Sequence, residues 1–299
     1  MIARRALLCV SAYLIGTGLA CSPAWGQTVP LEPALESGES VTGAFEGWFP
    51  NPDGSFSMLL GYFNRNTKQT FDIPVGQNNS IEPGGPDRGQ PTHFLPGRNW
   101  GLFVVKVPKD FGQTRLTWTL SANGKKTTIK PWLNPDYEIS PFISAADAGP
   151  DADTPPTLRF QDFKEQGAVV QGPQGLSTKR STTLNEPLPL TVWVSDDGKW
   201  FSNSGAKPRN LGPIPVVVTW SKFRGPGEVK FSKEKPPVDK LDTGDPKFVF
   251  NGKSSTTVTF TEPGDYVLHV TINDYSGEGG GGGFQCCWSN GFVNVSVSH

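Results

Sequence analysis

The chain has little cysteine, little histidine and almost no net charge. Among 299 residues there are four Cys and three His, and the formal net charge is −1. A balance so close to zero gives no long-range attraction for nucleic acid or for an anionic membrane surface, so we expect neither as a partner. No segment approaches the ~20 consecutive apolar residues of a transmembrane helix, so we expect no membrane-spanning segment in the mature chain.

The first residues have the features of an export signal. Arg4 and Arg5 precede an apolar stretch over residues 6–19, and the small-residue pattern of residues 24–26 follows it. Positive charge, a short apolar region and a small-residue cleavage site are the three parts of a secretory signal peptide. We therefore predict a signal peptide over residues 1–26 and a periplasmic or extracellular mature protein.

Cleavage there leaves the mature chain with two cysteines, the adjacent Cys286 and Cys287. The alternative is a lipid anchor at Cys21, where a lipoprotein signal would place its modified cysteine. The residues before Cys21 lack the usual aliphatic side chain three positions upstream, so we favour the unlipidated form. Two cysteines cannot build a disulfide scaffold, and stability must come from hydrophobic cores.

Glycine, proline and aromatic residues are plentiful: 35 Gly, 28 Pro, 19 Phe, 9 Trp and 5 Tyr. Turn formers beside bulky β-formers predict short strands joined by tight turns, and no window after the signal has a helical period. We predict an all-β fold with two β-sandwich domains in tandem, over residues 41–133 and 159–298. Residues 134–158 are expected to be a linker, because small residues, acids and prolines dominate them.

Turn chemistry marks several strand boundaries in the first domain. Residues 51–54, Asn-Pro-Asp-Gly, have the residue types of a tight hairpin turn. Asn123 and Gly124 supply the positive φ angles that a two-residue hairpin requires. Residues 77–97 are rich in glycine, proline and asparagine, so we expect a long loop there.

Three segments of the second domain resemble a PKD-like module, an immunoglobulin-type sandwich found in bacterial surface and secreted proteins. They are 218–231 (VTWSKFRGPGEVKF), 256–277 (TTVTFTEPGDYVLHVTINDYSG) and 293–297 (VNVSV). The resemblance implies that they are the middle and last strands of the sandwich, with a tyrosine corner at Tyr266. The usual aromatic-Asp-Phe-Gly-Asp-Gly stretch is absent, and residues 232–252 form a long insertion. Such modules serve as spacers, adhesive units or accessories to enzymes.

The adjacent cysteines are the only chemically unusual pair in the mature chain. Neighbouring Cα atoms across a trans peptide lie ~3.8 Å apart, closer than the ~4.4–6.8 Å of ordinary disulfides. The glycine run 279–283 just before them gives the backbone freedom. A disulfide between Cys286 and Cys287, free thiols, a bond to another chain and a metal site all stay open. No further ligand spacing accompanies the pair, which disfavours metal.

Tryptophans in or beside loops are the candidate binding residues: Trp100, Trp200 and Trp288. An exposed indole there could stack on a polysaccharide or on an envelope protein, which are the partners we expect. The competing interpretation is packing at the end of a sandwich, since large aromatic side chains mostly bury their area.

Catalytic and metal-ligating patterns are missing. His269 alternates with apolar residues along its strand, which predicts an exposed position on the sheet. Asp147, Asp151 and Asp153 in the linker, Asp196 and Asp197 after a strand, and Asp274 match no calcium loop, so we expect solvated acids in turns, no metal and no cofactor. The sequence therefore favours an exported, non-catalytic binding or structural protein. The alternative is an envelope thiol/redox protein or a hydrolase-associated accessory that uses Cys286 and Cys287.

Overall fold

The computed structural model describes residues 35–144, 152–200, 212–274 and 286–299. The predicted signal peptide (residues 1–26), the alternative lipid anchor at Cys21, the linker acids Asp147 and Asp151, and the glycine run 279–283 lie outside these ranges. Within them the secondary structure is almost entirely strand, with one 3-10 turn, η1 (Pro135–Tyr137). None of the described segments forms a helix long and apolar enough to cross a membrane. The predicted all-β fold is confirmed.

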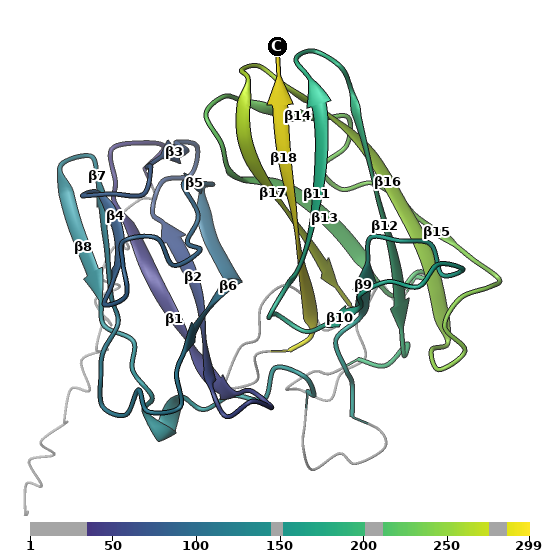
Figure 1. The fold of residues 1–299 in the computed structure, drawn as a ribbon, viewed down its shortest axis with the longest axis horizontal. Coiled ribbons are helices and arrows are strands. Elements are labelled where there is room, and N and C mark those ends of the chain that lie inside the picture. The colour runs from purple at the N-terminus through teal and green to yellow at the C-terminus, as the bar shows by residue number, and fades with distance from the viewer. Residues whose placement is uncertain (1–34, 145–151, 201–211, 275–285) are drawn as a thin grey trace, which may run out of the picture. The chain divides into compact units, whose positions relative to one another are not determined.

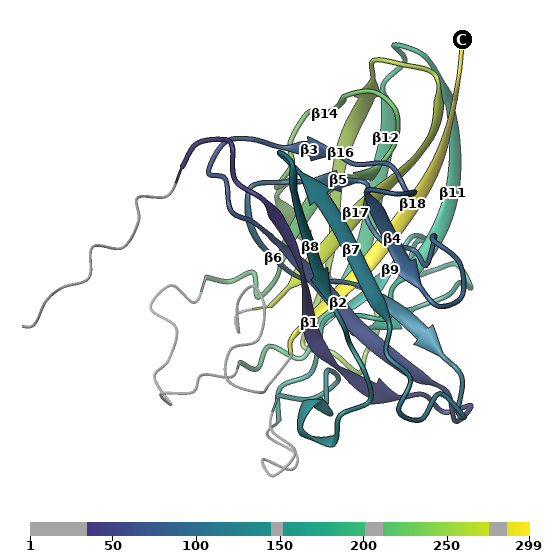
Figure 2. The same cartoon turned by 90° about the vertical axis from the view of Figure 1, so that its left-hand side faces the viewer.

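Two sheets of three strands and one pair of short strands make up the first sandwich (Figure 1). One sheet has the order β1 (Val41–Pro50), β2 (Phe56–Asn64), β6 (Gly97–Val107). The other has the order β4 (Asn79–Glu82), β7 (Thr117–Ala122), β8 (Lys125–Ile129). The short pair is β3 (Phe71–Asp72) with β5 (His93–Phe94). Figures 1 and 2 both show β1 and β8 side by side, which brings the two larger sheets together.

The predicted hairpin turns are confirmed. Residues 51–54 join β1 to β2, and the Asn51 amide donates to the Ser55 carbonyl at 2.8 Å. Asn123 and Gly124 have φ angles of 49° and 71°, and they connect Ala122 directly to Lys125 across the β7–β8 ladder. Both turns form from local backbone chemistry, which is why sequence suffices to place them.

Residues 77–97 contain strands β4 and β5, so the expectation of a long loop there is wrong. The buried side chain of Asn79 explains why this segment has regular structure. Its amide donates to the carbonyls of Ile73 and Pro91, at 2.9 and 2.8 Å. The indole N–H of Trp118 donates to the Asn79 amide oxygen at 3.1 Å. These tertiary bonds hold a segment whose composition alone indicates a loop.

The second sandwich consists of two facing sheets, as in an immunoglobulin-like fold. One sheet has the order β10 (Val170–Gln171), β9 (Thr157–Arg159), β12 (Leu188–Asp196), β16 (Phe250–Phe260), β14 (Val229–Phe231), and β15 (Val238–Lys240) also pairs with β16. The facing sheet has the order β11 (Leu176–Thr183), β18 (Trp288–Ser298), β17 (Gly264–Asn273), β13 (Val217–Arg224). β11 pairs with β18 in parallel, and the other ladders are antiparallel.

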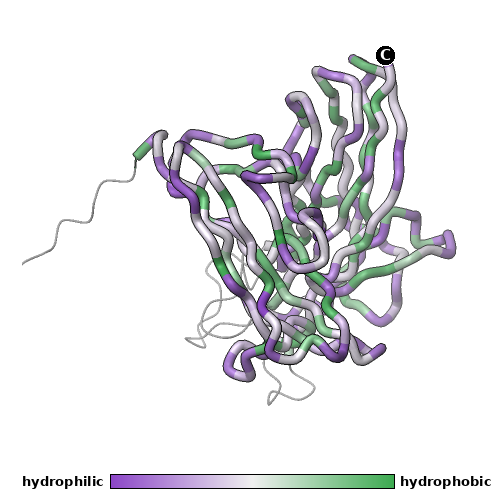
Figure 3. The backbone as a smooth tube through the Cα atoms, turned by 60° about the vertical axis from the view of Figure 1, so that its left-hand side comes forward, coloured by the Kyte–Doolittle hydropathy of each residue, from purple (hydrophilic) through white to green (hydrophobic). Residues whose placement is uncertain are grey.

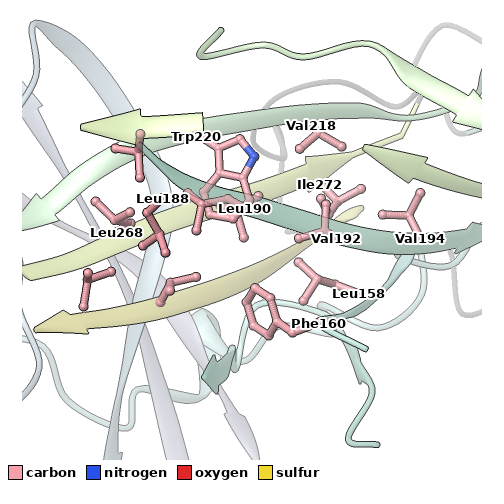
Figure 4. Packing of buried hydrophobic residues seen from close by; sticks show 14 of the residues in the cluster. Leu158, Phe160, Leu188, Leu190, Val192, Val194, Val218, Trp220, Leu268 and Ile272 are labelled. Atoms are coloured by element: carbon pink, nitrogen blue, oxygen red, sulfur yellow. The ribbon is translucent and has the colours of Figure 1, made fainter. Parts of the chain in front are cut away.

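Alternating apolar residues from the two sheets fill the second sandwich. Trp220 of β13, Val192 of β12 and Ile272 of β17 lie between the sheets and are buried (Figure 4). The alternation is visible along the strands as changes between green and purple (Figure 3). Each fully buried side chain of this kind contributes about 1.5–3 kcal/mol.

The predicted tyrosine corner is confirmed. The hydroxyl of Tyr266 donates to the Glu262 carbonyl at 2.8 Å and accepts from the Gly227 amide at 3.1 Å. The ring packs closely on Gly225, where a Cβ would overlap it. This bond network fixes the start of β17 against the loop that follows β13.

The outer face of β13, β17 and β18 is covered, so the prediction of an exposed His269 is wrong. His269 is only 2% exposed, and its ring centroid lies 5.1 Å from that of Phe292 and 5.9 Å from that of Phe223. Phe223 belongs to the hydrophobic core of the first sandwich and packs edge-on against Phe103. Alternation correctly assigns His269 to the outer face, but it carries no information about what packs on that face.

Candidate functional site

A small cleft lies where the irregular part of β6 meets the outer face of β13 and β17. Its volume is about 130 Å³, and its lining includes Trp100, Trp288, Arg98, Asn99, Thr271 and Asn273. This volume is roughly four times the volume that one water molecule occupies in liquid water. A ligand would therefore place one small part of itself in the cleft and leave the rest at its mouth.

Trp100 stands at this mouth because β6 is irregular there. The β2–β6 register shifts between Leu60 and Tyr62, opposite the segment that carries Trp100. Bulges of this kind re-aim side chains and are common beside functional sites. The Trp100 side chain stays 39% exposed, which makes it one of the few large aromatic residues on the described surface.

Arg98 holds one side of the Trp100 ring. Its guanidinium carbon lies 3.9 Å from the ring centroid, a cation–π contact. The same guanidinium donates to the Glu46 carboxylate and to the carbonyls of Tyr62 and Asn99, at 3.1 and 2.9 Å for the two carbonyls. Burial raises the pKa of Glu46, whereas the charge of Arg98 opposes that shift. Arg98 is thus fixed in place, and Trp100 is a preorganised surface.

Sequence reasoning did not select Arg98 as a site residue. The available signal was its position two residues before Trp100, because residues i and i+2 share one face of a strand. That spacing alone is common, and the buried partner Glu46 comes from a different strand.

Trp288 forms a wall of the cleft from a buried position. It is 2% exposed, and its indole N–H donates to the Gly101 carbonyl at 3.2 Å. Asn290 donates to the same carbonyl at 2.8 Å. Gly101 has a φ of +46°, and a Cβ at this position would overlap the indole. Trp288 therefore packs at the end of the sandwich, as the competing interpretation expects, and only the edge of its ring is open to a ligand.

Trp200, the third predicted tryptophan, follows the end of β12 and is half-buried. It is not among the residues that line the cleft. The structure thus brings Trp100 and Trp288 together and leaves Trp200 apart from them.

His269 also lines the cleft, and its burial predicts a pH dependence of stability. Burial, only partly offset by the hydrogen bond to Asn290, lowers the pKa of His269 to about 4. In the unfolded chain the imidazole of His269 takes up a proton near pH 6.5, whereas in the folded chain it does so only near pH 4. We therefore expect stability to fall by up to roughly 3 kcal/mol as the pH drops from 6.5 to 4.

Denaturant titrations at a series of pH values measure this loss. His269→Gln cannot titrate and should flatten the slope in that window, whereas His299→Gln at the exposed C-terminus should leave it unchanged. Equal slopes for wild type and His269→Gln would contradict the expectation.

Cys286 and Cys287 are joined to each other by a disulfide, with their Cα atoms 3.1 Å apart. The two residues are 6% and 0% exposed, and the amide of Asp274 donates to the Cys287 carbonyl at 3.4 Å. Thiol–disulfide exchange requires a thiolate to reach one of the sulfurs. Burial of both cysteines therefore disfavours the redox alternative.

Three of the aspartates expected to be solvated are buried, so the expectation is wrong for them. Asp153, Asp196 and Asp274 are 1%, 0% and 4% exposed. Carboxylate oxygens of Asp153 and Asp274 and the Cys287 sulfur all lie within 4.8 Å of one another. Burial, opposed by the hydrogen bond from the Gly198 amide and reinforced by the charges of Asp197 and Asp153, raises the pKa of Asp196 to about 8.

No known protein family matches the sequence, and no curated protein matches it significantly. Solved structures give distant similarities. The N-terminal domain of PorA aligns at a TM-score of 0.26 and 11% identity, over 48% of this chain and 96% of that one. A protein of unknown function from Porphyromonas gingivalis W83 aligns at 0.23 and 8%, over 86% and 100%.

CfaE, the adhesive subunit of the CFA/I fimbria of enterotoxigenic Escherichia coli, aligns at a TM-score of 0.22 and 6% identity, over 90% of this chain and 81% of that one. At such scores the common property is a β-rich chain, and no finer likeness follows.

Proposed function

We propose that this chain is an exported, non-catalytic recognition protein of the cell envelope or the extracellular space, and that the Trp100 cleft binds a saccharide unit of a polysaccharide. The observation that carries the proposal is an exposed indole held rigid by Arg98 at the mouth of a cleft that is lined by both apolar and hydrogen-bonding side chains. Export rests on the charged and apolar pattern of residues 1–26.

The chemistry of the cleft suits a sugar ring. A pyranose offers an apolar C–H face that stacks on an indole, and hydroxyl groups that both donate and accept hydrogen bonds. The cleft supplies the indole of Trp100 and the side chains of Asn99, Thr271 and Asn273. Amides donate and accept, and hydroxyls do the same, so they suit sugar hydroxyls in either direction.

The strand order of the second sandwich supports the proposal that it is a PKD-like module. In this assignment residues 41–133 and 159–298 are the two domains, and residues 134–158 connect them. β9 begins at Thr157, and the buried Leu158 already belongs to the second core. The last two residues of the connecting segment, Thr157 and Leu158, are therefore already part of the second sandwich.

A glycan array probed with the purified protein tests the proposed function. Removal of the stacking surface by Trp100→Ala should weaken binding by about 10-fold or more, since a well-placed aromatic contributes on the order of 1–3 kcal/mol. Trp200→Ala, the matched control outside the cleft, should bind like wild type. Thermal unfolding of both variants verifies that they remain folded.

An array without signal, or equal binding by wild type and Trp100→Ala, would overturn the saccharide assignment. Capture of a protein partner that depends on Trp100, together with a blank array, would assign the cleft to protein recognition instead.

A further inference from the structure

A second pocket enters the second sandwich through the seam between β11 and β12, and we call it the seam pocket. β11 is the edge strand of its sheet, and Figure 1 shows its end leading into β12, which belongs to the facing sheet. β9 pairs with β12 only from Trp193 to Ser195, so within the described residues no strand lies beside the first half of β12 on that edge. The seam pocket has a volume of about 170 Å³, and its lining includes Thr178 and Arg180 of β11 and Pro189 of β12.

The inner part of the seam pocket belongs to the hydrophobic core. It is lined by Phe160, Leu190, Val293 and Trp220, each of which is at most 5% exposed. Trp220 comes from β13, at the opposite edge of the sheet from β11, so the pocket reaches far between the two sheets. Figure 4 shows the indole of Trp220 beside Leu190. A cavity of ~150 Å³ with such an apolar lining holds one benzene molecule, so the seam pocket has room for a single six-membered ring.

Two indole N–H groups at this pocket are without acceptors. Trp220 and Trp193 both line it, and the Nε1–H of each is buried and has no hydrogen-bond partner among the described residues. An indole nitrogen is a donor only, so an acceptor must come to it. A buried donor without a partner costs free energy that a ligand oxygen inside the pocket would recover. The inner pocket therefore favours a ring that carries an oxygen atom.

The mouth of the seam pocket is positively charged. The guanidinium of Arg180 donates through Nη1 to the Thr178 hydroxyl at 3.0 Å and to the Lys179 carbonyl at 2.8 Å. In the described part of the chain no acid forms an ion pair with Arg180 or Lys179. Asp265, on the neighbouring surface, accepts from the Ser296 hydroxyl at 2.6 Å. An unpaired guanidinium favours a carboxylate, which it binds through two parallel hydrogen bonds.

A peptide strand is a poorer occupant of the seam than a small molecule. An added strand bonds to the backbone N–H and C=O groups of the edge that it joins. Pro189 lies on the free edge of β12 and has no N–H to offer. Lys179 and Arg180 place two charges on β11, and charged side chains are one of the means by which edge strands resist pairing.

We propose that the seam pocket binds a small aromatic carboxylate, whose ring lies among the core side chains and whose carboxylate is held by Arg180. An oxygen on the far side of the ring accepts from an indole N–H. A rigid ring loses little conformational freedom on binding, which favours an aromatic acid over a flexible aliphatic one. The seam pocket and the Trp100 cleft share no lining residue, so this site is independent of the proposed saccharide binding.

Titration of full-length protein labelled with ¹⁵N-tryptophan tests this proposal, with 4-hydroxybenzoate as the ligand. We expect a saturable shift of the Nε1–H resonance of Trp220 or Trp193, none for Trp100, and a dissociation constant of about 1 mM or below. Arg180→Gln removes the charge that holds the carboxylate, so it should weaken binding by 10-fold or more. Arg65→Gln, the matched control at an exposed position of the first sandwich, should bind as wild type does.

Two related ligands test each end of the molecule in the wild-type protein, without any variant that has to fold. The neutral 4-hydroxybenzamide should bind at least 10-fold more weakly, and benzoate, which lacks the ring hydroxyl, should shift the indole resonances less. No shift at Trp193 and Trp220 in about 10 mM 4-hydroxybenzoate would overturn the proposal. Unchanged affinity in Arg180→Gln, or equal affinity for the amide, would overturn the assignment to a carboxylate. None of these readouts depends on glycan binding.

Discussion

Replacement of Gly101 by alanine is expected to lower the free energy of unfolding by about 2–4 kcal/mol. Gly101 has a positive φ that alanine adopts only with strain, and the added Cβ would overlap the indole of Trp288. If the indole moves, its bond to the Gly101 carbonyl is lost as well. Trp288 joins β18 to β6, so its displacement would also open the wall of the cleft.

Urea denaturation of Gly101→Ala, followed by tryptophan fluorescence, measures this effect. Gly124→Ala is the matched control, because Gly124 also has a positive φ but nothing lies near its missing Cβ. It should lose only the backbone component, on the order of 1 kcal/mol. Equal decreases in the free energy of unfolding of the two variants would contradict the expectation, because they would mean that the Trp288 indole moves away from the added Cβ without loss of stability.

Replacement of Arg98 by leucine is expected to cost about 3–5 kcal/mol at neutral pH, because it leaves the buried carboxylate of Glu46 unpaired. Burial already raises the pKa of Glu46 above its ordinary value, and loss of the guanidinium would raise it further. A raised folded-state pKa means that stability is present at low pH and is lost as the pH rises through that value. The deficit of Arg98→Leu should therefore shrink on acidification.

The double variant Glu46→Gln/Arg98→Leu separates the lost ion pair from lost packing. It removes the buried charge, so it should recover much of the stability that Arg98→Leu loses at pH 7. Denaturant titrations of the three variants and wild type at pH 5 and pH 7 make the comparison. A deficit that does not change with pH, or a double variant as unstable as Arg98→Leu, would contradict this explanation.

Local chemistry in the sequence predicts much of the fold. The φ angles at Asn123 and Gly124 and the hydroxyl bonds of Tyr266 follow from residues close to each other in the chain. The strand alternation around His269 is equally local, and it assigns the correct face. The cover of that face by Phe223 and the core of the first sandwich is not local, which is why its burial could not be predicted.

The sites depend even more on distant residues. The sequence predicts Trp100 as a binding residue because it lies beside a loop. Its rigidity, however, comes from Arg98 and from Glu46 on another strand. Asp153 and Asp274 are far apart in the chain and meet only when the two sheets of the second sandwich close. Sequence spacing within a single loop therefore could not predict that these two carboxylates lie close together.

Nuclear magnetic resonance of protein labelled with ¹⁵N-tryptophan tests the saccharide-binding cleft most directly. The oligosaccharide with the strongest array signal is titrated into the protein, and the Nε1–H resonances are assigned from single Trp variants. The cleft predicts a saturable shift for Trp100, a smaller one for Trp288 at the wall, and none for the core residue Trp220. Shifts confined to Trp200, or no shift at Trp100 at saturating ligand, would contradict a binding site in this cleft.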